Sequence, residues 1–160
     1  MHNVLQFPSR ARAMTLDVDW ADLELAFRAA TGIENYLDKD SGDIVSLLPG
    51  FSDEEDLRDL LAQEPHRFSK LEPIGADFAR RVMGEFIDRQ KDSPLKQRLS
   101  AARSGSGSFT RCLALLKDDD QALSAYYRFE QARFWSHVES VLSALEVKPR
   151  TRPPGVDLFE

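Results

Sequence analysis

The chain has 160 residues, an ordinary size for one domain with a single core. Hydrophobic residues make up 42% and charged residues 30%, which excludes a disordered chain, and no apolar run approaches the roughly 20 residues that cross a bilayer. The net charge of −6 conceals an acidic segment at 15–79, with 5 basic against 16 acidic residues, and a basic segment at 80–111, with 8 against 3.

The N-terminal region is predicted to be a flexible arm followed by a helix. Residues 1–14 show no sustained periodicity, so we assign them to the arm. Asp19 is a predicted N-cap, and the helix is expected to stop at Gly32, whose backbone freedom ends helices. The residues expected on its buried face are Trp20, Leu23, Ala26, Phe27 and Ala30.

A β-hairpin is predicted at 33–48, where two short strands rich in Ile, Tyr and Val flank a turn of Asp, Ser and Gly residues. A short helix follows, with Ser52 and Glu55 as its capping box and Pro65 as its stop. The alternation in 66–74 indicates a third strand that ends at Pro73. Three strands are the minimum for a stable small sheet.

From Ala76 to about residue 146 the periodicity is helical. Ser93 and Pro94 are predicted to open one helix, a Ser-Gly turn at 104–108 ends it, and Ser108 is predicted to cap the next. A long final helix is expected to run to about Leu145, and the prolines beyond it predict an extended tail at 148–160.

These elements define an α+β fold. We expect a small antiparallel sheet of about three strands packed against a predominantly helical layer of five or so helices. The expected organisation is a single domain at 15–147 between the arm and the tail.

Four segments resemble a family known as uncharacterised protein family 0158. YLDKDSGDIV at 36–45 is similar to the family's hairpin, and FARRVMGEFI at 78–87 is similar to its Met-x-x-Phe-Ile helix. LSAARSGSGSFTR at 99–111 resembles its Gly-x-Gly-x-Phe-x-Arg segment, and YYRF at 126–129 resembles its aromatic box. The resemblance implies a shared fold and a bacterial, cytoplasmic setting, and it carries over no catalytic residue.

The glycine turn is the candidate ligand site. Gly105 and Gly107 precede a helix N-terminus with Arg111 one turn in, and with Arg80 and Arg81 they could bind an anion or a nucleotide. Neither the Lys-Ser/Thr of a P-loop nor the preceding strand of a dinucleotide fold is present. We favour the simpler interpretation, a tight turn in which glycine allows two helices to approach.

The remaining reactive side chains are interpreted as structural. Cys112 is the single cysteine, in register with buried apolar positions, and we expect a buried hydrophobe. His2, His66 and His137 lack metal-ligand spacing, so we predict no metal and no cofactor. We assign the aromatic block of the last helix to the core, with Tyr127 at a core-like spacing to later apolar positions, over an exposed stack for bases.

For function we favour a non-enzymatic protein-interaction or regulatory module with a protein partner that the sequence does not identify. The alternative is an enzyme or ligand-binding module with its site at the glycine turn and the basic stretch. The acidic composition argues against generic nucleic-acid binding, and the lack of a long apolar run argues against a membrane. Homo-oligomerisation stays open. A further hypothesis is that the basic stretch holds an anionic partner through Arg80, Arg81, Arg89, Lys91, Lys96, Arg98, Arg103 and Arg111.

The tail suggests one specific partner. Gly155 is followed by Val156, Asp157, Leu158 and Phe159, which resemble the short peptide by which bacterial replication and repair proteins dock on the sliding clamp. A proline-stiffened strand would deliver the last two as apolar anchors. The usual glutamine is absent and so short a pattern recurs by chance, so we favour an unstructured end or one that folds back on the domain.

Overall fold

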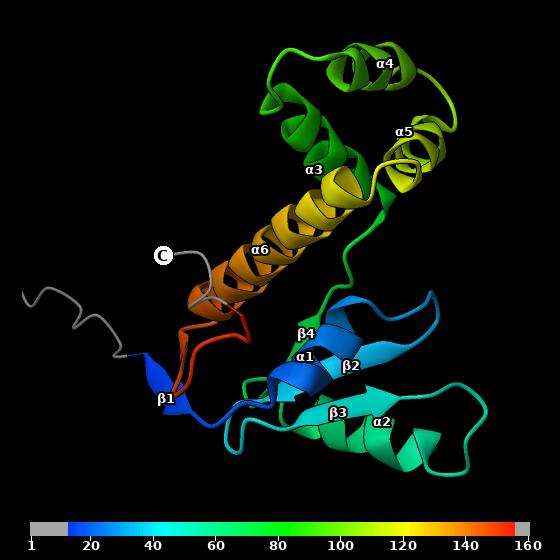
Figure 1. Ribbon diagram of the computed structural model, residues 1–160. Coiled ribbons are helices and arrows are strands. Elements are labelled where there is room, and N and C mark those ends of the chain that lie inside the picture. Colours follow the sequence, from blue (N-terminus) through cyan, green and yellow to red (C-terminus); the bar gives the residue numbers. More distant parts are fainter. Residues whose placement is uncertain (1–12, 156–160) are drawn as a thin grey trace, which may run out of the picture. The chain divides into compact units, whose positions relative to one another are not determined.

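The computed structural model describes residues 13–155, and its fold is α+β, as predicted (Figure 1). The chain divides into two compact units. Unit 1 comprises Met1–Glu72 and Val138–Glu160, and unit 2 comprises Pro73–His137. The organisation into one domain at 15–147 stays a prediction.

Unit 1 contains the predicted sheet. Its strands are β2 (Glu34–Asp38), β3 (Ile44–Leu47) and β4 (Phe68–Leu71), in the order β3-β2-β4 and antiparallel throughout. The predicted hairpin and third strand are therefore confirmed.

Two helices of unit 1 lie on opposite faces of this sheet. Helix α1 (Trp20–Phe27) lies over the face that carries Asn35 and Ser46, since residues of all three segments line one cavity. Helix α2 (Glu54–Gln63) lies over the other face, where its Arg58 pairs with Glu34. Successive residues of a strand alternate between the two faces, so neighbouring residues of β2 face different helices.

The ends of the helices differ from the predicted ones in two respects. The Asp19 carboxylate caps α1, as predicted, but α1 ends at Phe27 and leaves Ala30 exposed, because the chain must reverse before β2 begins. The predicted capping box of α2 is wrong: the N-cap is Asp53, without a side-chain cap bond. In its place, the Glu54 carboxylate accepts the backbone N–H of Gly50.

A second, two-stranded sheet in unit 1 was not predicted. β1 (Met14–Leu16) pairs in parallel with β5 (Val147–Pro149), in the segment where we expected the extended tail to begin. The indole N–H of Trp20 donates to the Thr151 hydroxyl at 2.9 Å. Order therefore extends beyond the expected limit at residue 148, because backbone pairing and this hydrogen bond fix the segment.

Unit 2 contains the four predicted helices of the second half, namely α3 (Ala76–Asp88), α4 (Pro94–Ala102), α5 (Ser108–Lys117) and α6 (Asp120–Ala144) up to His137. The Ser93 hydroxyl caps α4 as predicted, whereas α5 has Gly107 at its N-cap and Ser108 as its first residue. A buried cluster holds the helices together: Met83, Phe86, Ile87, Leu99, Cys112, Leu116 and Tyr126.

No helix in residues 13–155 has the length and apolar character needed to cross a membrane.

Candidate functional site

The glycine turn joins α4 to α5, and Arg111 organises it. Gly105 and Gly107 have left-handed backbones, with φ of 85° and 73°. The guanidinium of Arg111 folds back from α5 and donates to the carbonyls of Ala102 at 3.2 Å, Ser104 at 2.6 Å and Ser106. The carbonyl of Ala102 lies in the last turn of α4 and the other two lie just after it, where carbonyls lack partners within the helix. Much of the donor capacity of Arg111 is therefore used within the turn.

The other predicted binding residues are only partly brought together. Arg80 lines a cavity of about 130 Å³ with Gly107 and Ser108, at the N-terminus of α5. Arg81 instead lies over the ring of Phe78, with its guanidinium carbon 5.5 Å from the ring centroid. Arg81 and Gly105 do not line this cavity. Arg80 is also paired with Asp77.

Arg103, which the sequence analysis placed only in the basic stretch, lies close to this region. It lines an adjoining cavity of about 120 Å³ with Arg80 and Ser108. Its Nη1 is 2.5 Å from the Asp88 carboxylate, and a β-carbon at Gly84 would lie 2.9 Å from its Nη2. Gly84 thus leaves room for the guanidinium to cross α3. A single glycine inside a helix is a signal in the sequence that could have pointed to such a close approach.

Cys112 is buried, as predicted, and its thiol donates to the carbonyl of Leu99 at 3.8 Å. Burial raises the pKa of this thiol, which disfavours the reactive thiolate. Burial likewise lowers the pKa of His137, whose ring packs 5.6 Å from that of Phe78, with Arg81 as the lesser cause.

The aromatic block of α6 is mostly buried, as predicted. Tyr126, Phe134 and Trp135 are at most 3% exposed. Tyr127 is the exception, with 51% of its surface exposed, so its assignment to the core was wrong. Its neighbour Tyr126 occupies the core position instead and packs edge-on against Phe86 at 5.4 Å.

Helix α2 and the residues just before it form an exposed surface that was not predicted as a binding site. We call it the α2 surface. Phe51, just before the helix, is 62% exposed, and Leu60 is 39% exposed. No residue of α2 is buried. The exposed carboxylates of this surface belong to Asp53, Glu55, Asp56 and Asp59.

Those four carboxylates have no ion-pair partner among the described residues, whereas Glu54 pairs with Arg58 at 3.2 Å. Asp56 lies one helical turn before Leu60, so negative charge and exposed apolar surface adjoin. This combination is typical of a surface that binds a basic and partly apolar partner. Its signal in the sequence was an acidic run that continues past the first helical turn to Asp59.

Residues 13–155 contain no group of three or more His, Cys, Asp and Glu side chains that could hold a metal ion. The sliding-clamp hypothesis rests on Val156, Asp157, Leu158 and Phe159, which lie outside the described residues, and it stays a prediction.

The fold and these surfaces define an α+β protein built from a small three-stranded sheet and a helical unit. The family model of the Uncharacterised protein family (UPF0158) matches residues 11–152, so the chain belongs to this family, as the sequence motifs indicated. No curated protein and no solved structure matches the chain.

Proposed function

We propose that the protein acts by binding another protein through the α2 surface, rather than by catalysis. The observation that carries the proposal is the exposure of Phe51 and Leu60 beside four carboxylates without ion-pair partners in the described part of the chain. The setting that we propose, from the family resemblance, is the bacterial cytoplasm.

Charge complementarity decides what kind of partner fits. Unpaired carboxylates on one short helix attract a segment rich in Lys and Arg, and such attraction speeds encounter and weakens as salt is added. The apolar side chains of Phe51 and Leu60 would then contribute the buried contact area that holds the complex together. The partner is therefore a protein that presents a basic segment with at least one exposed apolar side chain.

The test compares partners captured from native cells by the wild type and by three variants of the full chain. One form carries Phe51→Ser with Leu60→Ser, and a second carries Glu55→Gln, Asp56→Asn and Asp59→Asn. Tyr127→Ser is the matched control, because Tyr127 is 51% exposed but lies in unit 2. Circular dichroism checks that every form is folded.

The proposal expects a partner with a basic segment that the wild type and Tyr127→Ser retain and that both α2 variants lose. A synthetic peptide of that segment should bind the purified wild type more weakly at high salt. Equal capture by all forms would overturn the proposal. So would a homodimer that only the α2 variants dissociate, since a second copy would then be the natural occupant.

A second candidate function, anion binding at the glycine turn, is favoured by the cavity that Arg80 lines with the first residue of α5. Inorganic phosphate titrated into ¹⁵N-labelled protein should then shift the backbone resonances of Ser108 and Phe109, and Arg80→Gln should remove the shift. Unchanged resonances would remove this candidate without affecting the first.

A further inference from the structure

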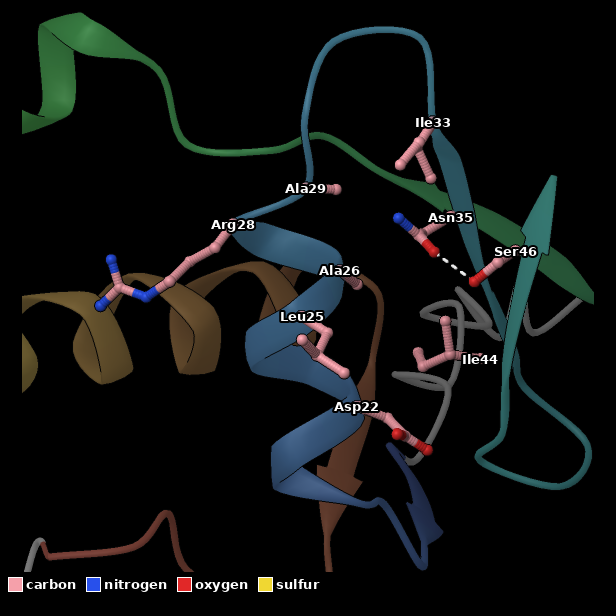
Figure 2. Close-up of a pocket in the computed structure, with 9 residues that line it drawn as sticks. All are labelled: Asp22, Leu25, Ala26, Arg28, Ala29, Ile33, Asn35, Ile44 and Ser46. Carbon is pink, nitrogen blue, oxygen red and sulfur yellow. Dashed lines mark hydrogen bonds between the residues drawn. The ribbon is translucent and has the colours of Figure 1, made fainter. Parts of the chain in front are cut away.

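A cavity of about 420 Å³ opens in unit 1 between α1 and the face of the sheet that α1 covers (Figure 2). Its walls are apolar, formed by Leu25, Ala26 and Ala29 from the α1 side and by Ile33 and Ile44 from the sheet side. This volume lies in the range of small-molecule sites, roughly 300–1,000 Å³, whose walls are usually apolar with a few placed polar groups. Neither the α2 surface nor the glycine turn contributes to it.

The polar groups of the cavity are Asn35 and Ser46, on paired positions of β2 and β3. Asn35 is only 5% exposed, and its Oδ1 accepts a hydrogen bond of 2.6 Å from the Ser46 hydroxyl. Figure 2 shows its amide nitrogen directed away from Ser46, toward Ala29 and the cavity. No described residue accepts a hydrogen bond from this nitrogen.

This arrangement presents one donor and one acceptor to a ligand. The Asn35 nitrogen opens on the cavity, and a ligand that covers it there must supply a hydrogen-bond acceptor, because amide groups that are buried are almost always hydrogen-bonded. The Ser46 hydroxyl hydrogen is committed to Asn35, which leaves the oxygen lone pairs of Ser46 as acceptors. A neutral amide satisfies both groups, because its carbonyl accepts from Asn35 and its N–H donates to Ser46.

The charged side chains at the rim favour a neutral ligand. The Asp22 carboxylate is directed toward the cavity and would repel an anion (Figure 2). Arg28 contributes mainly its aliphatic stem, because its guanidinium points away and pairs with Glu24 at 3.4 Å.

We propose that this cavity binds a neutral molecule with a flat apolar body that carries a carboxamide or a lactam. The body packs between the alanines on the α1 side and the isoleucines on the sheet side, and the amide meets Asn35 and Ser46. The site is independent of the α2 surface, so each proposal can fail alone.

The test uses benzamide as the probe and the full chain labelled with ¹⁵N. Benzamide is expected to cause saturable shifts of the Asn35 side-chain amide and of the backbone amides of Ala29 and Ile44. A ligand of this size has a dissociation constant in the low millimolar range, on the order of 1–10 mM. Benzoate, which has the same shape but carries a charge, should bind at least about tenfold more weakly.

Three variants test the location of the site. Ala29→Phe should fill the cavity and abolish the shifts, whereas Ala30→Phe, at an exposed neighbouring position that does not line the cavity, should leave them unchanged. Ser46→Ala should weaken benzamide binding about fivefold or more, because it removes the acceptor. Absence of saturable shifts in the folded wild type, equal binding of benzoate, or binding that survives Ala29→Phe would each overturn the proposal.

Discussion

The guanidinium of Arg67 donates two parallel hydrogen bonds to the carboxylate of Asp38, from Nε to Oδ1 and from Nη2 to Oδ2, each 2.9 Å long. Asp38 is the last residue of β2 and Arg67 lies just before β4, so this ion pair links two neighbouring strands. Asp38 is 6% exposed, and its Oδ1 also accepts the backbone N–H of Asp40 in the hairpin turn. The hydrogen bonds from Arg67 are the main cause that lowers the pKa of Asp38 to about 2.

This pair predicts a loss of stability in acid. The pKa of Asp38 is lower in the folded chain than the ordinary value of 3.8. The ionised carboxylate therefore stabilises the fold above about pH 3.8, and this stabilisation is lost as the pH falls toward 2. We expect the free energy of unfolding to fall by about 2 kcal/mol from this group over that interval.

Urea denaturation at a series of pH values measures the effect. Asp38→Asn should have a flatter acid profile than the wild type. Asp43→Asn removes a carboxylate from the same hairpin that accepts no hydrogen bond from any described residue, and this variant should keep the wild-type profile. An unchanged slope in Asp38→Asn would contradict the assignment.

Gly42 is the position in the hairpin turn where a side chain is least tolerated. Its φ is 86°, and a β-carbon there would overlap the backbone carbonyl of Asp17. Gly50 has a similar φ of 81° but open space around it. We therefore expect Gly42→Ala to cost about 3 kcal/mol, from backbone strain and steric overlap, and Gly50→Ala about 1 kcal/mol, from strain alone. Thermal and urea unfolding compare the two, and equal losses would show that the Asp17 contact is unimportant.

Arg111 should matter for stability although its side chain is exposed. Arg111→Ala removes the donors to three carbonyls of the glycine turn, and we expect a loss of about 1.5 kcal/mol. Arg98→Ala is the matched control, since Arg98 is an exposed arginine of α4 with no such bond to another described residue, and the variant should stay within about 0.5 kcal/mol of the wild type. Chemical denaturation of both variants measures the difference. A loss in Arg111→Ala no larger than the control's would show that the guanidinium does not hold the turn.

Cys112 should be unreactive toward thiol reagents in the folded protein. It is completely buried and its thiol pKa is raised, chiefly by burial, so little thiolate is accessible. A thiol-specific chromogenic disulfide should react with no cysteine in buffer and with one in urea, because the chain has a single cysteine. Rapid stoichiometric reaction of the native protein would show instead that α4 and α5 open readily at this point.

The elements that the sequence predicted well are those defined by local patterns. The Asp19 and Ser93 caps, the hairpin turn and the helical periodicity from Ala76 onward all act over a few residues. The pairing of β1 with β5 escaped prediction because it joins segments about as far apart as the chain allows, and each strand has only three residues.

The candidate sites were harder to predict because they also depend on contacts between segments that are distant in the sequence. The glycine turn was located correctly, yet the use of Arg111 as a cap for carbonyls depends on the direction of one side chain. The cavity beside α1 is formed by three segments whose residues are individually unremarkable, and only the register that pairs Asn35 with Ser46 places its polar groups together. Exposure of Leu60 likewise depends on how deeply α2 lies against the sheet.

The parallel pairing of β1 with β5 has a consequence for the order in which the chain is completed during translation. Hydrogen bonds from Met14 to Glu146 and from Arg150 to Leu16, with the ion pair of Asp17 and Arg150 at 3.1 Å, join the two extremities of unit 1. All of unit 2 is synthesised between them. During synthesis, β1 therefore stays without its partner strand until the segment up to Arg150 has left the ribosome.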